Sequence, residues 1–464
     1  MGRHQLPPQL RKLMRLAYVS PVLTVLSLTL LLWTYRQDLA FQFWTGYHRA
    51  ASESQSPEQK VPQGEKVSFT GVNGTKTVLV AAYQEHRATK KEVRIIAVVL
   101  RSETVTYRCI LRCEDRLSVS VGTCDVHSDH FDFAYGTADI MCPLPSDCAS
   151  PSHVAVISDA HVSEETLDKE FLEVKNRKAY DSFPLNFTVC LSTMFDFSNV
   201  LQLVQSLEML QLLGVGRVVV YLTSCSPETQ RVLDYYTQKG LVEVIPWSMS
   251  RYLNVSRGWL PYHGPGDLHY FGQIPALNDC MYRYMYRSRY LAQHDIDELI
   301  LPQAVNSWTE LLPLLEEEYG ADRCYMFENN VFPISVSRPP PASQTLPLQD
   351  CCPGWHNVSG VNILAHLYQE PIITETHYTN FKLIVNPRVV FSPSVHGLLS
   401  SVQGCSWVDR SIARMYHTRG PKQTELTSDQ LIYDGRLLSY SSSLIPKVNA
   451  AFRESGLLPE DGLL

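Results

Sequence analysis

Residues Phe187–Leu222 read FTVCLSTMFDFSNVLQLVQSLEMLQLLGVGRVVVYL, and this stretch decides the fold class. It opens and closes on short apolar segments, Phe187–Leu191 and Arg217–Leu222, which are typical of buried strands. Between them, apolar residues recur at the spacing of a helix face: Val200, Leu203, Val204, Leu207 and Leu210. Gly214 then ends the predicted helix. A strand, a helix and a strand in this order predict a parallel β-α-β unit.

The same alternation continues toward the C-terminus. Ser226-Pro227 is typical of a helix start, and the next strand is predicted at Leu241–Ile245. A further helix over Ile274–Tyr290 leads to the acidic triplet Asp295-Ile-Asp297. The pattern predicts an α/β fold with a parallel sheet that is covered by helices on both faces. Because ligands bind such sheets at the carboxyl ends of the strands, we expect the triplet to lie at a binding site.

Asp295 and Asp297 have the clearest chemical implication in the chain. At positions i and i+2 of an extended segment, two carboxylates point the same way and repel one another. Their hard oxygen ligands suit Mg²⁺ or Mn²⁺, and such an ion can also bridge the phosphates of a nucleoside diphosphate. We therefore predict a metal–nucleotide site, with a solvated turn or a helix N-cap region as the alternative for such a triplet.

The N-terminal region predicts a membrane anchor. Residues Leu16–Tyr35 carry no charge and would span about 30 Å as a helix. Only basic charges precede them, so the positive-inside rule places residues 1–15 in the cytoplasm and the rest of the chain in a lumen. A cleaved signal peptide is the alternative, although its apolar region would be shorter. Residues 36–75 are rich in Ser, Gln, Glu and Pro and are predicted to form a solvated stem.

A lumenal location agrees with the cysteines and the glycosylation sequons. All 12 cysteines follow the predicted anchor, and so do four Asn-x-Ser/Thr sequons, at Asn73, Asn186, Asn254 and Asn357. Both features are typical of an oxidising, glycosylating compartment. Structural disulfides are therefore predicted, with zinc thiolates and free thiols as the alternatives.

Residues 76–165 predict a separate all-β domain. Short β-branched and aromatic segments follow one another there without helical spacing, and five cysteines lie between positions 109 and 148. A small β-sandwich with a structural or acceptor-orienting role is expected. The net charge of the chain is −7, from 40 basic and 47 acidic residues, and no long basic block follows the anchor. Nucleic acid is therefore excluded as an expected partner.

Several segments together resemble glycosyltransferase family 92. They are Cys190–Thr193, Leu213–Tyr221, Gln293–Pro302, Lys382–Pro387, Val395-His396 and Met415–Arg419. The resemblance covers about residues 186–440 and implies a GT-A-type, Rossmann-like catalytic domain in a Golgi membrane protein of type II topology. It also implies metal-dependent transfer of galactose, in a β linkage, from UDP-galactose to an N-glycan of a glycoprotein, with core fucose as the best-known acceptor. The chain departs from the family pattern at Leu299 and in the block His417-Thr-Arg419.

Roles for individual residues follow from the resemblance and from the chemistry of the side chains. Asp297 is predicted to coordinate Mn²⁺ or Mg²⁺, and Asp295 to bind the ribose or the metal through water. The late histidines His396 and His417 are candidate third ligands, with packed or surface histidines as the alternative. Predicted contacts to the nucleotide sugar are Thr193, Asp295 and Lys382, where Lys382 would neutralise diphosphate charge and a surface lysine is the alternative. Glu328 is the candidate general base, with a structural glutamate as the alternative.

Two other functions remain open at this point. One is a catalytically degenerate transferase that acts as a lectin or as a Golgi scaffold, although the intact Asp295 and Asp297 argue against it. The other is a metal phosphohydrolase, in which Thr or Val generally follows the second aspartate, whereas Glu298 does so here.

Overall fold

The structure, a computed structural model, describes residues 66–114, 116–159, 170–341, 354–373, 375 and 378–459. The predicted cytoplasmic tail (1–15) and membrane anchor (16–35) lie outside the described residues, as does most of the predicted stem (36–75). Within the ranges that are described, no helix is both long enough and apolar enough to cross a membrane.

The N-terminal strands form one eight-stranded sheet. They are β1 (Thr70–Gly71), β2 (Val78–Glu85), β3 (Glu92–Leu100), β4 (Tyr107–Cys113), β5 (Arg116–Val126), β6 (Tyr135–Pro143), β7 (His153–Ser158) and β8 (Leu172–Lys175). The order is β1-β2-β3-β6-β5-β4-β7-β8, and β8 also pairs in parallel with β2, which closes the sheet into a barrel. Strands β1 and β8 lie outside the predicted limits of 76–165.

The prediction of a β-sandwich is therefore wrong, although the all-β character is confirmed. β5 explains the difference, because its 11 residues pair with two neighbours. Its first part, Arg116–Gly122, pairs with β4, and its last part, Thr123–Val126, pairs with β6. One long strand thus turns the corner that would otherwise separate two sheets, and strand spacing in the sequence does not reveal such a corner.

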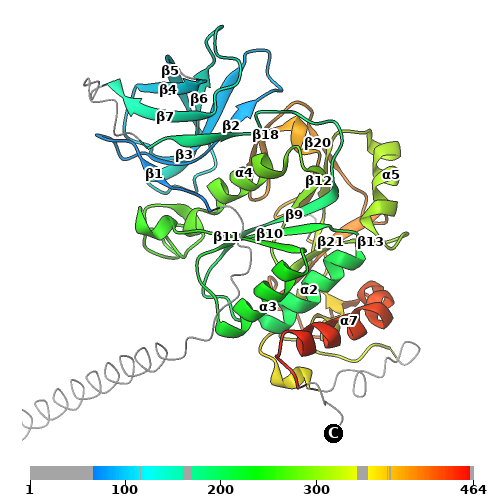
Figure 1. The fold of residues 1–464 in the computed structure, drawn as a ribbon. Helices are drawn as coiled ribbons and strands as arrows, with labels where there is room; N and C mark the ends of the chain where they lie inside the picture. The colour runs from blue at the N-terminus through cyan, green and yellow to red at the C-terminus, as the bar shows by residue number, and fades with distance from the viewer. Residues whose placement is uncertain are drawn as a thin grey trace, which may run out of the picture. The chain divides into compact units, whose positions relative to one another are not determined.

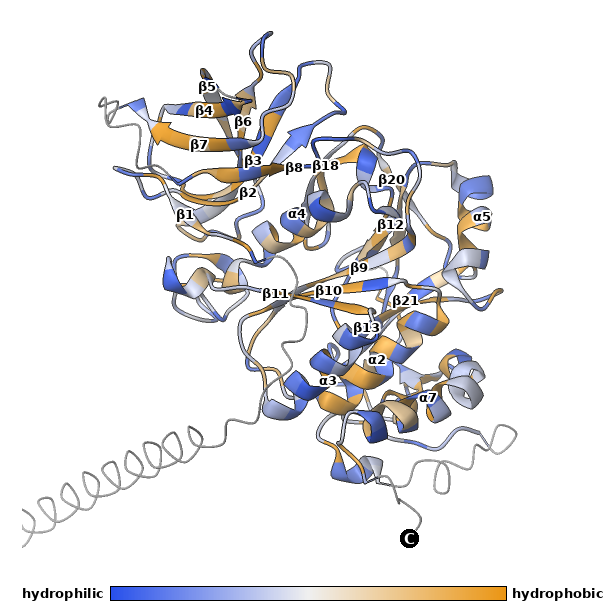
Figure 2. Ribbon diagram, in the orientation of Figure 1, coloured by the Kyte–Doolittle hydropathy of each residue, from blue (hydrophilic) through white to orange (hydrophobic). Residues whose placement is uncertain are grey.

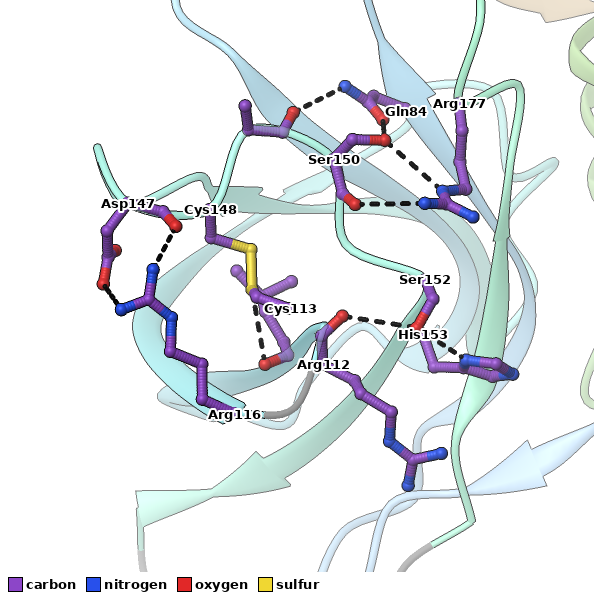
Figure 3. Close-up of a disulfide and its surroundings, with 12 residues drawn as sticks. Gln84, Arg112, Cys113, Arg116, Asp147, Cys148, Ser150, Ser152, His153 and Arg177 are labelled. Atoms are coloured by element: carbon purple, nitrogen blue, oxygen red, sulfur yellow. Dashed lines mark hydrogen bonds and ion pairs between the residues drawn. A yellow bond between two sulfur atoms is a disulfide. The ribbon is translucent and has the colours of Figure 1, made fainter.

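Disulfides link distant parts of the described chain, as the cysteine distribution predicted. The four bonds are Cys109–Cys142, Cys113–Cys148, Cys190–Cys280 and Cys324–Cys405. Figure 3 shows the Cys113–Cys148 bond, where Arg116 and Asp147 form an ion pair of 3.1 Å beside it. Cys124 and Cys225 are free thiols, and Cys351 and Cys352 lie outside the described residues.

The C-terminal part is built on a seven-stranded sheet of order β11-β10-β9-β12-β17-β14-β20. Its strands are β9 (Leu185–Met194), β10 (Arg217–Leu222), β11 (Val242–Pro246), β12 (Ser288–Gln293), β14 (Cys324–Phe327), β17 (Lys382–Val385) and β20 (Cys405–Trp407). Strands β9 to β12 are parallel, and β17 is antiparallel to β12 and β14. The chain builds outward from β9 to β10 and β11, and then returns to β12 on the other side of β9. The strand order therefore reverses between β9 and β12.

Helices cover both faces of this sheet, as predicted (Figure 1). They are α2 (Val200–Leu212), α3 (Pro227–Gln238), α4 (Gln273–Tyr284), α5 (Trp308–Tyr319) and α7 (Ser441–Glu454). Val189 and Leu191 of β9 pack into the core with α2, α3 and α7, whereas Cys190 between them packs into the core with α4. A strand that is buried on both faces has no side that faces solvent, which explains the three consecutive apolar residues Val189, Cys190 and Leu191. Figure 2 shows the strands of this sheet coloured by hydropathy.

The predicted helix over Ile274–Tyr290 is too long. α4 ends at Tyr284, and Ser288–Gln293 form β12 instead. β12 lies between β9 and β17 and pairs with both. The residues of β12 are compatible with a helix, so pairing with partners that are distant in the sequence decides their conformation.

Smaller elements complete the C-terminal part. The strands β13 (Glu298–Pro302), β21 (Ala413–Arg419) and β15 (Asn329–Pro333) form a second sheet in that order. β18 (Val390–Ser394) and β19 (Gly397–Ser401) form a hairpin, and β16 (Tyr368–Gln369) pairs with β22 (Ile432–Tyr433). The short 3₁₀ helices are η3 (Met249–Arg251), η4 (His269–Gly272), η6 (Trp355–Asn357), η7 (Ile363–Ala365), η9 (Pro387–Val389) and η10 (Arg436–Tyr440).

The barrel and the seven-stranded sheet share one hydrophobic core. Val80 and Ile96 of the barrel belong to the same buried cluster as Leu277 of α4. A polar contact crosses the same boundary, because the hydroxyl groups of Tyr83 (β2) and Tyr221 (β10) each donate to the buried carboxylate of Asp279, at 2.6 Å. The barrel and the seven-stranded sheet therefore pack as one unit, and the barrel buries one side of α4.

Removing the Cys190–Cys280 bond with the double substitution C190A/C280A should destabilise the protein. The bond joins β9 to α4 across 90 residues of sequence, and its loss costs about 2–4 kcal/mol in the chain-entropy account. Thermal unfolding without reductant should show a lower Tm. The substitutions C124S and C225S are the matched controls, because both thiols are unpaired. A double variant that melts with the controls would contradict the expectation.

Candidate functional site

The predicted site residues gather where the strand order reverses. β9 and β12 are parallel neighbours, so the segment Ser192–Met194 and the acidic triplet Asp295–Asp297 emerge at the same edge of the sheet. Open α/β sheets have a crevice at such a reversal. Here the crevice is a cleft of about 750 Å³. Its walls include Ser192, Thr193, Phe195, Trp259, Tyr270, Gln273, Asp295, Asp297, Glu298, His396, His417 and Arg419.

Asp295 lies at the foot of the cleft and is held by two partners. The ammonium of Lys382 donates to Asp295 Oδ2 at 3.0 Å, and the Ser192 hydroxyl donates to Oδ1 at 3.1 Å. Gln273 Nε2 in turn donates to the Ser192 hydroxyl at 2.8 Å. Burial alone raises the pKa of Asp295, but the Lys382 ammonium outweighs it and lowers the pKa to about 2. This carboxylate is therefore ionised and fixed in direction.

Lys382 is the buried cation of the site. It is only 3% exposed, and its ammonium lies 3.3 Å from Glu298 Oε2 as well as beside Asp295. Burial acts to lower the pKa of Lys382, yet the two carboxylates raise it above its ordinary value. Burial raises the pKa of Glu298, which is 2% exposed. Glu298 also closes the turn, because its Oε2 accepts from the backbone N–H of Asp295 at 2.7 Å.

Asp297 pairs with His417 across the second sheet. The Nε2 atom of His417 lies 3.3 Å from Asp297 Oδ2, and its Nδ1 lies 3.4 Å from Glu298 Oε1. The β13–β21 register places His417 directly opposite Glu298. Burial works against the charged ring, but Glu298 and Asp297 raise the pKa of His417 above its ordinary value. An imidazole and a carboxylate thus meet at the cleft wall.

Thr193 and His396 also line the cleft. The Thr193 hydroxyl donates to the carbonyl of Tyr270 at 3.3 Å. His396 lies in the turn between β18 and β19, with its ring centroid 5.5 Å from that of Trp259. Burial, reinforced by Lys382, lowers the pKa of His396 to about 4, so the ring is neutral near pH 7.

Glu328 is placed differently from the other predicted residues. Its side chain is 1% exposed, and Oε1 lies 3.5 Å from Arg410 Nε. Glu328 is not among the described residues that line the cleft. It borders a smaller pocket instead. Its role as general base stays a prediction. The structure thus brings together Thr193, Asp295, Asp297, Lys382, His396 and His417, but not Glu328.

Sequence reasoning assigned no role to several residues of the cleft. Ser192 stood within a segment that carried the family resemblance, and Gln273 directly precedes the predicted start of α4, but neither had a distinguishing motif. Trp259 and Tyr270 come from the long connection between β11 and α4, where no periodic signal exists. Only the folded chain reveals that this connection faces Asp295.

The donor groups of the cleft offer few ligands for the predicted metal. Among the described residues, no three His, Cys, Asp or Glu side chains are grouped to hold a metal ion. Asp297 and His417 nevertheless offer one carboxylate and one imidazole beside each other on the cleft. Mg²⁺ is commonly held by one or two carboxylates together with substrate phosphates and water, and imidazole also suits transition metals. The pair therefore fits a cation whose remaining ligands come from a bound diphosphate, while Asp295 is engaged by Lys382.

Comparison with known proteins gives a family for most of this region. A sequence profile of glycosyltransferase family 92 matches residues 186–453. Two Caenorhabditis elegans proteins, described as glycosyltransferase family 92 proteins F13G3.3 and ZK381.2, are 26% and 24% identical to the chain over 138 and 140 residues. Each match covers 30% of this chain and 27% of the relative, so the chain spans about a quarter of the length of each curated relative that it matches.

The substitution Lys382→Met should destabilise the fold and eliminate the function of the cleft. It leaves Asp295 and Glu298 without their shared cation, and breaking a buried pair in this way costs about 3 kcal/mol. Urea unfolding at neutral pH should show a lower midpoint. Adding Glu298→Gln should restore part of the loss, because one of the two carboxylates is then neutral. A single variant that unfolds at the wild-type midpoint would show that Lys382 has no such structural role.

Proposed function

Because the chain belongs to glycosyltransferase family 92, we propose that it transfers galactose, in a β linkage, from UDP-galactose to a glycan of a glycoprotein. The acceptor that the family resemblance favours is an N-glycan, with its core fucose as the first candidate. The observation that carries the proposal is the cluster of Asp295, Asp297 and Lys382 at the reversal between β9 and β12. This is the place where an open α/β sheet holds a nucleotide.

The arrangement of the strands supports a GT-A-type domain. The first four strands of the sheet along the chain are β9, β10, β11 and β12. If they are numbered one to four, their order across the sheet is three, two, one, four. Antiparallel β17 follows on the far side of β12 and carries Lys382 at its start. A nucleotide over β9 and β12 would thus meet Thr193 at the carboxyl end of β9 and Asp295 just after the carboxyl end of β12.

The residues of the cleft suit a leaving diphosphate. Lys382 keeps Asp295 ionised and fixed, so this carboxylate can accept hydrogen bonds from a ribose. Asp297 and His417 are the groups that would hold Mn²⁺ or Mg²⁺. Such a cation, when bound, neutralises charge on the departing UDP. Transfer also requires a group that takes the proton of the acceptor hydroxyl, and Glu328 remains the predicted residue for it.

A donor screen with metal control tests the proposal. The purified lumenal part should release UDP from UDP-galactose in the presence of a glycoprotein acceptor and Mn²⁺, and excess EDTA should stop the reaction. Asp297→Asn should abolish turnover with an unchanged Tm, because the side chain keeps its volume and loses one negative ligand. Transfer that persists in excess chelator would refute the metal role. Transfer from UDP-glucose or UDP-N-acetylglucosamine, but not from UDP-galactose, would keep the reaction and replace the donor.

A Golgi location with a lumenal catalytic part completes the proposal. The asparagines of all four sequons, Asn73, Asn186, Asn254 and Asn357, are exposed in the structure. Four disulfides within the described residues agree with an oxidising compartment.

Glycosidase treatment of the protein from animal cells should lower its apparent mass, because oligosaccharyltransferase acts only on lumenal sequons. Electrophoresis before and after digestion measures the shift. The variant in which all four asparagines are replaced by Gln is the control and should show no shift. An unchanged mass for the wild-type chain would place these residues outside the lumen.

A further inference from the structure

One wall of the cleft is aromatic and uncharged. Trp259 and Tyr270 both line it, with ring centroids 5.8 Å apart, and both rings are half-buried. The ring of His396 lies beside the same wall, with its centroid 5.5 Å from that of Trp259. Burial and the nearby charges of Asp295 and Asp297 raise the pKa of Tyr270, so this ring borders the carboxylates. The Trp259 ring carries no charge and offers none to a phosphate.

The loop that carries Trp259 is built to be rigid. Gly258 approaches Gly264 so closely that a Cβ on Gly258 would lie 2.5 Å from the Gly264 nitrogen. The Ser256 hydroxyl donates to the Gly264 carbonyl at 2.9 Å and accepts from the Gly258 N–H at 2.9 Å. A loop that is closed in this way holds Trp259 in place before any ligand arrives, which lowers the entropy cost of binding.

Two strained segments support the same wall. Tyr270 and Phe271 adopt φ angles of 35° and 54°, and Phe131 and Asp132 in the β5–β6 loop adopt 51° and 63°. Bulky residues in the left-handed region are strained and persist only where the surroundings enforce them, which is typical of ligand clamps. In both segments the strained residues include an aromatic ring that packs at this wall.

The barrel reaches the wall through its β5–β6 loop. The ring of Phe131 lies 5.0 Å from Trp259 and stacks on His269 at 4.3 Å, and His269 packs edge-on to Trp259 at 4.6 Å. In the same region, Tyr135 at the start of β6 donates its N–H to the Asp267 carbonyl at 2.9 Å. Phe131 and His269 thus stand behind Trp259 and fix its position.

The same barrel loop also holds the turn that carries His396. The Ser394 hydroxyl donates to the carboxylate of Asp129, so the β18–β19 hairpin is tied to the barrel two residues before His396. The Nδ1 atom of His396 is buried and has no hydrogen-bond partner among the described residues. A ring with an unused polar atom beside an aromatic wall suits a ligand with hydroxyl groups.

We propose that Trp259, supported by Phe131 of the barrel, is the platform on which a sugar ring of the acceptor glycan binds. An aromatic ring suits the apolar face of a sugar, and His396 offers a polar partner for its hydroxyl groups. A nucleotide over the reversal between β9 and β12 would leave Trp259 for the second substrate. The inference rests on the proposed transferase function and assigns to the barrel a part in acceptor binding.

Equilibrium binding separates the two substrates. Calorimetry would first measure the Kd for UDP in the presence of Mn²⁺. In saturating UDP, it would then measure the Kd for three probes: a core-fucosylated N-glycan, the same glycan without fucose, and a high-mannose N-glycan. Trp259→Ala should weaken binding of the preferred glycan by about ten-fold, whereas the Kd for UDP should stay within about two-fold. Phe131→Ala should weaken glycan binding in the same direction, and Trp259→Phe should retain part of the affinity.

Two matched controls test the specificity of these effects. Tyr262→Ala changes a ring in the same loop that is 79% exposed and lies outside the described cleft wall, and it should leave both affinities unchanged. His269→Phe keeps an aromatic ring behind Trp259 and should also leave glycan binding intact. Both ring nitrogens of His269 are buried without a hydrogen-bond partner among the described residues, so an apolar ring is tolerated there.

The outcomes distinguish this inference from the proposed function. An equal loss of UDP and glycan affinity in Trp259→Ala would overturn the inference, because the ring would then serve the nucleotide or the fold. Failure of all three glycans to bind the wild-type protein would also overturn it. Glycan binding that depends on Trp259, in a protein that transfers no sugar from any UDP-sugar, would support the platform and refute the transferase function. Sugar transfer by Trp259→Ala with an unchanged KM for the acceptor would support the transferase function and refute the platform.

Discussion

The ammonium of Lys382 is the interaction on which the site is built. A cation that is 3% exposed must be compensated, and Asp295 and Glu298 lie within 3.3 Å of it. The ion pairs connect β17 to the turn after β12, and they direct Asp295 along the cleft wall. Glu298 carries the constraint further, because it contacts His417 and thereby the second sheet. Asp297 lies in this turn and meets His417 at the cleft, where its carbonyl also accepts from the N–H of Thr418 at 2.9 Å.

The barrel and the site are connected through the packing of α4. Its strands bury α4 from the side opposite to the sheet, and Asp279 of α4 accepts from tyrosines of both parts. α4 begins with Gln273, which donates to Ser192 and so reaches the hydrogen bonds of Asp295. A change in the packing of the barrel would therefore reach the cleft through α4, even without the aromatic contacts of Phe131.

Much of the fold is predictable because local sequence patterns indicate it. The β-α-β unit over Phe187–Leu222 appears in the structure as β9, α2 and β10, and the closely spaced cysteines form disulfides. The failures share one physical cause. Local patterns predict a helix end where β12 lies and a sandwich where the barrel lies, because strand partners that lie far away in the sequence decide both structures.

Local sequence patterns are enough to predict the α/β class, the parallel strands, and the pair of neighbouring carboxylates Asp295 and Asp297. Apolar periodicity and the i, i+2 geometry are local properties, so they need no knowledge of the rest of the chain. The folded chain is needed to show that Lys382 neutralises Asp295, that His417 meets Asp297, and that Glu328 lies outside the described wall of the cleft. These contacts join residues that are tens of positions or more apart, and the pairing register of the two sheets brings them together.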